Sequence, residues 1–321
     1  MTKRVIFDTD IGIDDAMALL FLHGAPEAEL AAITTVAGNA SLDDVTRNAQ
    51  VVAERFGIDA PVFRGAPGPL GEALGEGYPD FVHGRNGLGD IPLPVPARRA
   101  EDLPAAEAIV ELARRHPGEL SVVAVGRLTN LANALALEPA LPGLLKELVV
   151  MGGVFGFHGH RGNVSPVTEA NFGGDPLAAD RVLGAGIPTT VVGLDVTQET
   201  IMDEAFIDAL VARAGDAGAF IHAITRFYFD FYEGLGDGRQ CPIHDSSAVA
   251  YLLYPALYET VSGPVRVVTG GVALGQGILG EHPERYLSDA WRDRPACRVA
   301  RSVDADGVRE RYLAALSKLA R

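Results

Sequence analysis

The feature that most constrains the fold is the alternation of short β-branched segments with helical segments along most of the 321 residues. Expected strands cover 4–7, 31–36, 61–63, 121–125, 148–151, 189–192, 265–269 and 298–303, and expected helices cover 14–22, 42–56, 105–115, 128–137, 176–183, 203–235, 246–253 and 306–319. Such alternation is typical of a mainly parallel central sheet with helices on both faces, so we expect an α/β fold with an open, doubly wound, Rossmann-like architecture. Because no segment has the composition of a linker, we expect a single domain spanning residues 1–321.

An acidic loop follows the first expected strand, at the edge of the sheet where ligands of such folds bind. It reads Asp8-Thr9-Asp10-Ile11-Gly12-Ile13-Asp14-Asp15, and no Lys or Arg lies between Arg4 and Arg47. Two ionised carboxylates about 4 Å apart repel by roughly 4 kcal/mol at an effective dielectric near 20. The loop therefore favours a hard divalent cation such as Ca²⁺ or Mg²⁺. The alternative is that Asp14 and Asp15 cap a helix that begins there.

Further polar side chains stand after other expected strands or at helix starts. They are Asn39, then Asn163, Glu169, Asn171 and Asp175 in and after the Gly-rich segment 152–174, and His244 with Asp245 in Pro242-Ile243-His244-Asp245. Amides and carboxylates at these spacings could bind several hydroxyls, which suits a sugar, and a histidine titrates near neutrality. Turn and capping chemistry is the alternative for each of them.

Charge and composition exclude several classes of protein. The chain has 27 Lys and Arg against 42 Asp and Glu, a net charge of −15, which disfavours binding to nucleic acid or to an anionic membrane. No apolar run reaches the roughly 18 residues of a membrane span, and the acid at position 8 interrupts the core of any signal peptide. Cys241 and Cys297 are too few for a disulfide framework. We therefore expect a cytoplasmic protein with reduced thiols.

Taken together, these segments resemble the inosine–uridine-preferring nucleoside hydrolase family. The most specific match is Asp8-Thr9-Asp10-Ile11-Gly12-Ile13-Asp14-Asp15-Ala16, which is similar to the family's DTDxGxDDA signature. Other matches follow in order: Val36-Ala37-Gly38-Asn39, Val82-His83-Gly84 with Gly87-Leu88-Gly89, Gly126-Arg127-Leu128-Thr129-Asn130, Met151-Gly152-Gly153, Gly162-Asn163, Glu169-Ala170-Asn171-Phe172 with Asp175-Pro176, and Pro242-Ile243-His244-Asp245. Each motif alone is weak, but the ordered set covers about residues 5 to 255.

The resemblance implies an activity, a metal and roles for individual residues. The activity is hydrolysis of the N-glycosidic bond of a ribonucleoside to ribose and free base. The ion is Ca²⁺, held by the carboxylates of Asp10, Asp15 and Asp245 and the backbone carbonyl of Thr129, with Asp10 as the base that activates water. The implied ribose ligands are Asp14, Asn39 and Asn171 for the 2′- and 3′-hydroxyls, Asn163 and Glu169 for the 5′-hydroxyl, and Met151 packed nearby. His83 would come from a mobile loop over the site, His244 would stand near the leaving base, and the chain would form a homodimer or homotetramer.

The chain departs from the family pattern at a few positions, and two other functions stay open. Ile11 stands where the family often has Pro, Arg127 where Pro often precedes Leu-Thr-Asn, and Ala170 where Phe is common. Because of the departures at Arg127 and Ala170, the motifs do not indicate which base is preferred. A Mg²⁺-dependent phosphatase with an Asp nucleophile would suit Phe7-Asp8-Thr9-Asp10 but would need a phosphate-binding Lys, and none is well placed. A nucleoside-binding protein without turnover is the other alternative.

Three remaining features favour ordinary structural roles. The aromatic residues of 227–232 could stack on a base, but packing in a helix core is the preferred interpretation. His158 and His160 could bind a transition metal, but no third ligand is evident and a flexible exposed loop is favoured. The Gly275–Gly280 segment fits G-x-G-x-x-G, yet Glu281-His282-Pro283 is a poor helix start, so a dinucleotide site is not expected.

Overall fold

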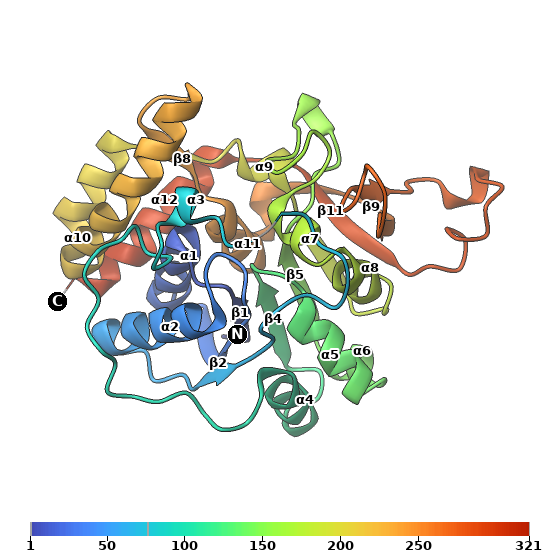
Figure 1. Cartoon of the computed structure of the whole chain (residues 1–321), viewed down its shortest axis with the longest axis horizontal. Coiled ribbons are helices and arrows are strands. Elements are labelled where there is room, and N and C mark those ends of the chain that lie inside the picture. The colour runs from blue at the N-terminus through green and yellow to red at the C-terminus, as the bar shows by residue number, and fades with distance from the viewer. Residues whose placement is uncertain (1, 76, 321) are drawn as a thin grey trace.

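The computed structural model describes residues 2–75 and 77–320. A nine-stranded sheet with the order β10-β9-β11-β6-β5-β4-β1-β2-β3 forms its centre (Figure 1). Its strands are β1 (Lys3–Thr9), β2 (Ala28–Thr35), β3 (Val62–Arg64), β4 (Leu120–Ala124), β5 (Glu147–Met151), β6 (Thr189–Val192), β9 (Tyr258–Val267), β10 (Gly277–Leu279) and β11 (Ala296–Val303). A separate two-stranded sheet pairs β7 (Ile201–Asp203) with β8 (Gln240–Pro242).

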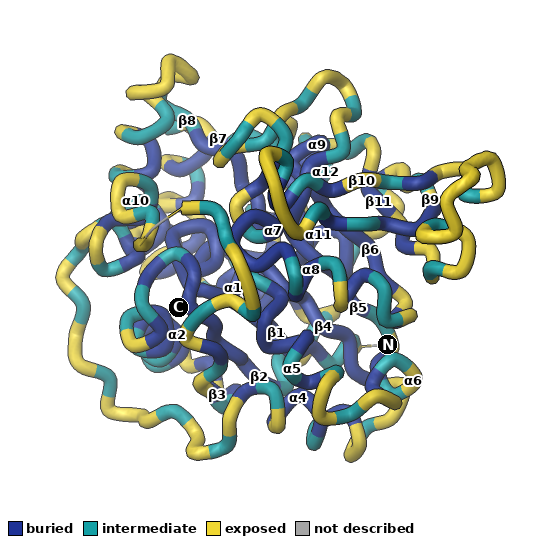
Figure 2. Tube along the Cα trace, turned by 45° about the vertical axis from the view of Figure 1, so that its right-hand side comes forward, coloured by how far each residue is buried: buried dark blue, intermediate teal, exposed yellow. Residues whose placement is uncertain are grey.

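The sheet is mostly parallel, as expected. Every pairing from β3 across to β11 is parallel, whereas β9 runs antiparallel to β11 and to β10. The chain places β2 and β3 on one side of β1 and then resumes with β4 on the other, which creates a switch point between β1 and β4. The central strands are buried, while the connecting loops carry most of the exposed residues (Figure 2). A ligand crevice is expected at the carboxyl ends of β1 and β4.

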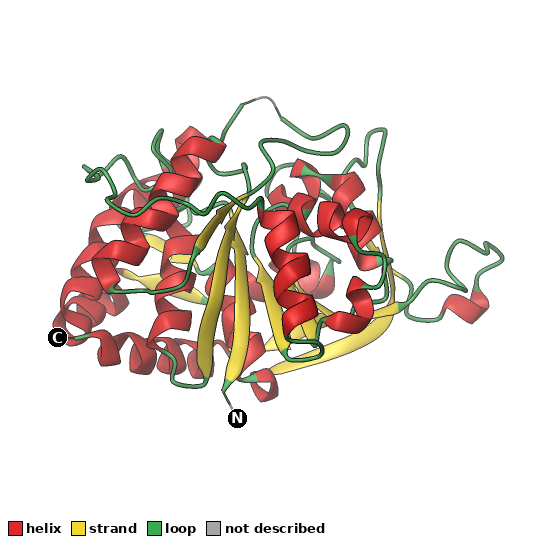
Figure 3. Ribbon diagram, turned by 90° about the horizontal axis from the view of Figure 1, so that it is seen from below, coloured by secondary structure: helices red, strands yellow, loops and turns green. Residues whose placement is uncertain are grey.

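Helices cover both faces of the sheet, which confirms the doubly wound architecture (Figure 3). One face carries α1 (Ile13–Gly24), α2 (Leu42–Phe56), α10 (Glu204–Leu235), α11 (His244–Leu253) and α12 (Ala305–Leu316), and the other carries α4 (Ala105–Arg115), α5 (Thr129–Leu137), α6 (Leu141–Leu144) and α8 (Pro176–Leu183). Shorter elements are α3 (Asp80–His83), α7 (Ala170–Gly174), α9 (Leu194–Thr197) and the 3₁₀ turns η1 (Phe157–Gly159), η2 (Pro255–Leu257), η3 (Pro283–Arg285) and η4 (Ser317–Leu319). Val5 and Phe7 of β1 enter one core and Ile6 enters the other, as strand alternation requires.

Local chemistry explains why several elements have the expected bounds. Helix α2 begins after Ser41, whose hydroxyl accepts the backbone N–H of Asp44. It ends at Gly57, which adopts a left-handed φ of 67° that glycine favours. Helices α4 and α8 and strand β6 also match the expected bounds.

The late part of the chain differs from expectation. Strand β9 begins at Tyr258, well before the expected residue 265, and its direction is antiparallel. The G-x-G-x-x-G segment contains the edge strand β10, and within the described chain only the 3₁₀ turn η3 separates it from β11, so the helix that a dinucleotide site needs is missing. Residues 280–295 extend away from the sheet (Figure 1).

No membrane-spanning helix was found in the described part of the chain, because none of its helices is both long enough and apolar enough.

Candidate active site

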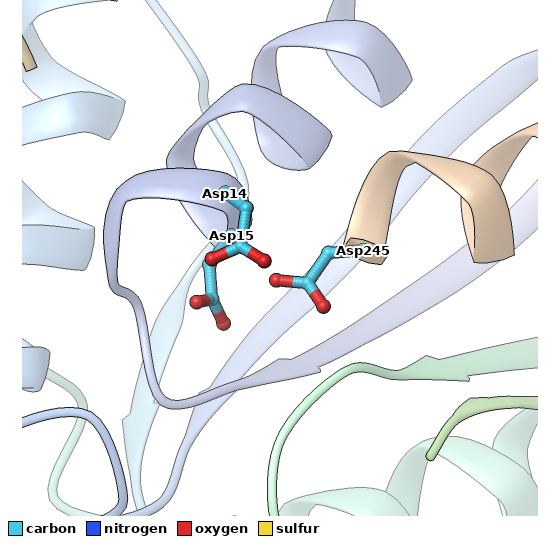
Figure 4. A group of neighbouring side chains, drawn as sticks. All are labelled: Asp14, Asp15 and Asp245. Carbon is cyan, nitrogen blue, oxygen red and sulfur yellow. The ribbon is translucent and has the colours of Figure 1, made fainter. Parts of the chain in front are cut away.

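Three carboxylates from distant parts of the sequence meet at the edge of the sheet. Asp14 and Asp15 lie in the first turn of α1, and Asp245 lies in the first turn of α11. Their carboxylate oxygens lie within 4.8 Å of one another, and all three side chains are buried (Figure 4). The close approach of Asp245 to the acidic loop, on which the sequence argument depends, is therefore present in the structure.

Asp15 is held in place by three donors. The hydroxyl of Thr9 donates to its Oδ1 at 2.5 Å. The backbone N–H of Gly12 and the side-chain amide of Asn39 donate to its Oδ2 at 2.8 and 2.9 Å. These bonds draw the end of β1, the start of α1 and the loop after β2 around one carboxylate. The capping alternative is thus partly right, because Asp15 does bond to the backbone at the helix start.

Asp10 lies beside this cluster and keeps one oxygen without a partner. Its Oδ2 accepts the backbone N–H of Asn39 at 3.0 Å, whereas Oδ1 is buried and has no hydrogen bond in the described chain. A side chain at Gly38 would overlap this carboxylate, so glycine is required there for the close approach. A buried oxygen without a partner is costly, and a cation would satisfy it.

The electrostatics of the cluster demand positive charge. Burial raises the pKa of Asp14 to about 8, with a further contribution from the charge of Asp15. Burial also raises the pKa of Asp10 and Asp245 well above the ordinary value of 3.8, and the neighbouring carboxylates add to both shifts. Within residues 2–75 and 77–320, no Lys or Arg forms an ion pair with any of these acids. An all-oxygen donor set of this kind fits a hard divalent ion.

A cavity of about 720 Å³ opens above the carboxylates. Every residue assigned to ribose or base binding from the sequence lines it: Asp14, Asn39, His83, Met151, Asn163, Glu169, Asn171 and His244, together with the metal-site residue Asp245. Asp10, Asp15 and Thr129 do not line it and lie buried. No Lys or Arg of the described chain lines the cavity either. A phosphate-binding site would need such a cation, so the phosphatase alternative lacks its main feature.

The polar side chains on the β5 side of the cavity are held by backbone contacts. Asn171 donates its amide to the carbonyls of Val125 and Met151 at 2.8 and 3.1 Å, which leaves its amide oxygen available. Glu169 caps α7 and accepts the backbone N–H groups of Gly153, Asn171 and Phe172. Asn163 accepts the backbone N–H of Ala170. These groups are preorganised in a way that suits recognition of several hydroxyls.

Comparison with known proteins decides the family. Residues 5–310 match the family model described as inosine-uridine preferring nucleoside hydrolase. The chain belongs to this family. It is a ribonucleoside hydrolase that cleaves an N-glycosidic bond, and the resemblance found in the motifs is confirmed.

Similar proteins cover nearly the whole hydrolase. It is 37% identical over 318 residues to uridine nucleosidase 1 of Arabidopsis thaliana, an alignment covering 98% of this chain and 94% of the relative. The solved structure of a plant nucleoside hydrolase has a TM-score of 0.94 at 32% identity and covers 99% of both chains. The structure of a purine-preferring ribonucleoside hydrolase from Gardnerella vaginalis has a TM-score of 0.90, also at 32% identity and 99% coverage of both.

Both histidines of the hydrolase's cavity are buried and neutral. Burial lowers the pKa of His244 to about 4, and its ring nitrogens contact the hydroxyls of Thr197 at 2.8 Å and Tyr232 at 3.2 Å. Burial also lowers the pKa of His83 to about 3, and its Nδ1 accepts the backbone N–H of Ile13 at 3.3 Å. At neutral pH the ring of His244 is therefore uncharged, and both of its nitrogens have hydroxyl partners.

Asp8 and Thr129 have contacts that the motifs did not indicate. Asp8 points into the sheet and accepts the hydroxyl of Thr34 and the amide of Asn130. Thr129 begins α5, and its hydroxyl donates to Asp175 at 2.6 Å. Asp8 therefore has a structural role outside the carboxylate cluster.

The preferred packing role of the aromatic segment is confirmed, because Tyr228 and Phe229 are buried in the core and Phe227, Phe231 and Tyr232 pack against it. In addition, Tyr228, Phe231 and Tyr232 line the cavity. The hydroxyl of Tyr228 also donates to Asp14 at 3.4 Å. Helical spacing was the missed signal, since residues three and four apart share one face of α10. Leu235, one turn further along, lines the cavity as well.

Proposed function

We propose that the hydrolase binds Ca²⁺ through the carboxylates of Asp10, Asp15 and Asp245 and the backbone carbonyl of Thr129. The single observation that supports this most strongly is the buried cluster of Asp14, Asp15 and Asp245, beside which Asp10 keeps an oxygen without a partner among the described residues. Bound Ca²⁺ supplies positive charge that favours deprotonation of a nearby water. The oxygen-only ligand set favours Ca²⁺ or Mg²⁺ over softer metals.

We propose that Asp10 is the general base for the attacking water. Its carboxylate would take the proton from a water held beside the cation, while the backbone N–H of Asn39 keeps the carboxylate in place. The breaking N-glycosidic bond develops positive charge on the ribose, as in glycoside hydrolysis generally. Buried carboxylates around the sugar stabilise that charge electrostatically.

The remaining cavity residues would bind two parts of the substrate, the ribose and the base. Asp14, Asn39 and Asn171 would bind the 2′- and 3′-hydroxyls, and Asn163 and Glu169 the 5′-hydroxyl, with Met151 packed nearby. His83 and His244 would stand on the side of the base, where His244 donates a hydrogen bond to the leaving group. We also propose that the hydrolase forms a homodimer or homotetramer, as the resemblance implies, and that it acts in the cytoplasm, as its composition led us to expect.

A product assay tests this function directly. Incubating the hydrolase with inosine, with uridine and with a phosphate ester is expected to release free base and ribose from the nucleosides and no phosphate from the ester. Reducing-sugar and phosphate measurements on the same samples distinguish the reactions. Release of phosphate, or binding of nucleosides without products, would contradict the proposal.

Deoxynucleosides are expected to be poor substrates. A missing 2′-hydroxyl leaves the buried acceptors of the ribose site unpaired, which costs about 1–3 kcal/mol, so kcat/KM should fall by roughly 5- to 150-fold or more. The measurement compares inosine with deoxyinosine, and uridine with deoxyuridine. Equal rates for either pair would refute the ribose contacts assigned to Asp14 and its neighbours.

A further inference from the structure

The residues that follow α9 contact the loop after β5, and one of them also lines the cavity. In that loop, Nδ1 of His160 lies 2.8 Å from Oε1 of Gln198, and Nε2 lies 2.6 Å from Oε1 of Glu199. Gln198 lines the cavity. The sequence led us to expect a free loop here, but His160 is bonded to the two consecutive residues that follow α9.

Gln198 stands on the wall that faces the base in the proposed function, on which this inference rests. The residue before it, Thr197, contacts the ring of His244. The strand that follows pairs Ile201 with Pro242, and both line the cavity. Gln198 thus belongs to the wall that includes His244, whereas Asn163, Glu169 and Asn171 belong to the loop and helix after β5.

The contacts of His160 fix the orientation of the Gln198 amide. Nδ1 of His160 faces the amide oxygen of Gln198 and Nε2 faces a carboxylate oxygen of Glu199, and a ring N–H can donate to either oxygen. The amide oxygen of Gln198 is then occupied. Its amide nitrogen makes no hydrogen bond to the described residues of the chain and is left to donate to a ligand.

We propose that Gln198 is a specificity-determining residue that donates a hydrogen bond to an oxo group of the base, and that His160 is the positioning residue that holds it. Uracil and hypoxanthine carry a carbonyl oxygen where cytosine and adenine carry an amino group. A donor at this position favours the oxo bases, because an amino group would face another N–H. The family description names inosine and uridine, which both carry such an oxo group.

Changing the donor into an acceptor tests the role of Gln198. Gln198→Glu keeps the size of the side chain, but its outward oxygen can only accept a hydrogen bond. The ratios of kcat/KM for uridine over cytidine and for inosine over adenosine are expected to fall at least about tenfold, the effect of one hydrogen bond of about 1.4 kcal/mol. Unchanged ratios, or an equal loss for all four nucleosides, would overturn the assignment.

A matched pair of histidine variants tests the positioning role. His160→Asn shortens the side chain and removes the hold on Gln198, so both ratios should fall by about threefold or more, within the range of one hydrogen bond. His158→Asn changes the same loop, but among the described residues the His158 side chain hydrogen-bonds only to the carbonyl of Arg301, so both ratios should stay within about twofold.

Equal effects of the two histidine variants would overturn the positioning role, because a loosened loop would then explain both. These outcomes are distinct from failure of the proposed function. In that case the unchanged hydrolase itself would release no ribose from any of the four nucleosides.

Discussion

Asp10→Asn is expected to lower kcat at least about 10³-fold while leaving the fold intact. A positioned general base contributes about 10²–10⁴-fold to a rate, and asparagine cannot take the proton. The amide also removes one negative charge from the ligands proposed for the cation. The backbone N–H of Asn39 can still donate to the amide oxygen, so the loops around residue 10 should stay in place. Steady-state kinetics with inosine and a circular dichroism spectrum measure the two effects.

Asp8→Asn is the matched control for this change. Asp8 is equally buried, lies two residues away and also has one oxygen without a partner among the described residues, but its other oxygen bonds to Thr34 and Asn130 inside the sheet and it lies outside the carboxylate cluster. We expect its kcat to stay within about tenfold of the unchanged hydrolase, since no step of the proposed reaction uses it. If both variants lost activity equally, or if Asp10→Asn kept most of its rate, Asp10 would not be the base.

The sequence was most informative where local signals agreed with the tertiary structure. Helix α2 occupies the residues expected for it, 42–56, and it begins after Ser41, a capping residue that the sequence itself shows. The acidic loop could be interpreted as a candidate cation site because carboxylates clustered without a nearby Lys or Arg favour a bound cation. The approach of Asp245 to Asp15 came from the family resemblance, because no local pattern relates two residues 230 positions apart.

What sequence reasoning missed depends on contacts between distant segments. Strands β7 and β8 have three residues each, which is too short for any periodicity. The antiparallel direction of β9 follows from its pairing with β11 rather than from its own residues. Burial also changed the expected protonation of His244. A histidine ordinarily titrates near neutrality, but burial lowers the pKa of His244 to about 4. The partner of His160 lies 38 positions away and gives no local signal.

Removing divalent metal is expected to abolish turnover and to destabilise the folded chain. Without the ion, the positive charge proposed to activate water is lost, so activity in a chelator should fall by at least about 10³-fold and return with added Ca²⁺. A ligand at about 100 times its Kd stabilises the folded state by about 2.7 kcal/mol, which corresponds to several degrees in Tm. Thermal melts and rates with EDTA, and then with excess Ca²⁺, measure both effects. Identical rates and melting temperatures in the two buffers would exclude a bound metal.

The pH dependence of this stabilisation separates a metal site from a general salt effect. Asp14 has an ordinary pKa of 3.8 when unfolded and about 8 when folded without metal, so the metal-free folded state holds a proton that the unfolded chain releases. Metal-free stability should therefore fall as pH rises between those values. Ca²⁺ binds the deprotonated carboxylates, so the gain in Tm from Ca²⁺ should be larger at pH 8 than at pH 5. Asp245→Asn should reduce that gain, and Asp8→Asn should leave it unchanged, because only Asp245 belongs to the cluster. A gain in Tm that is the same at both pH values, or the same in both variants, would mean that Ca²⁺ acts elsewhere on this acidic chain.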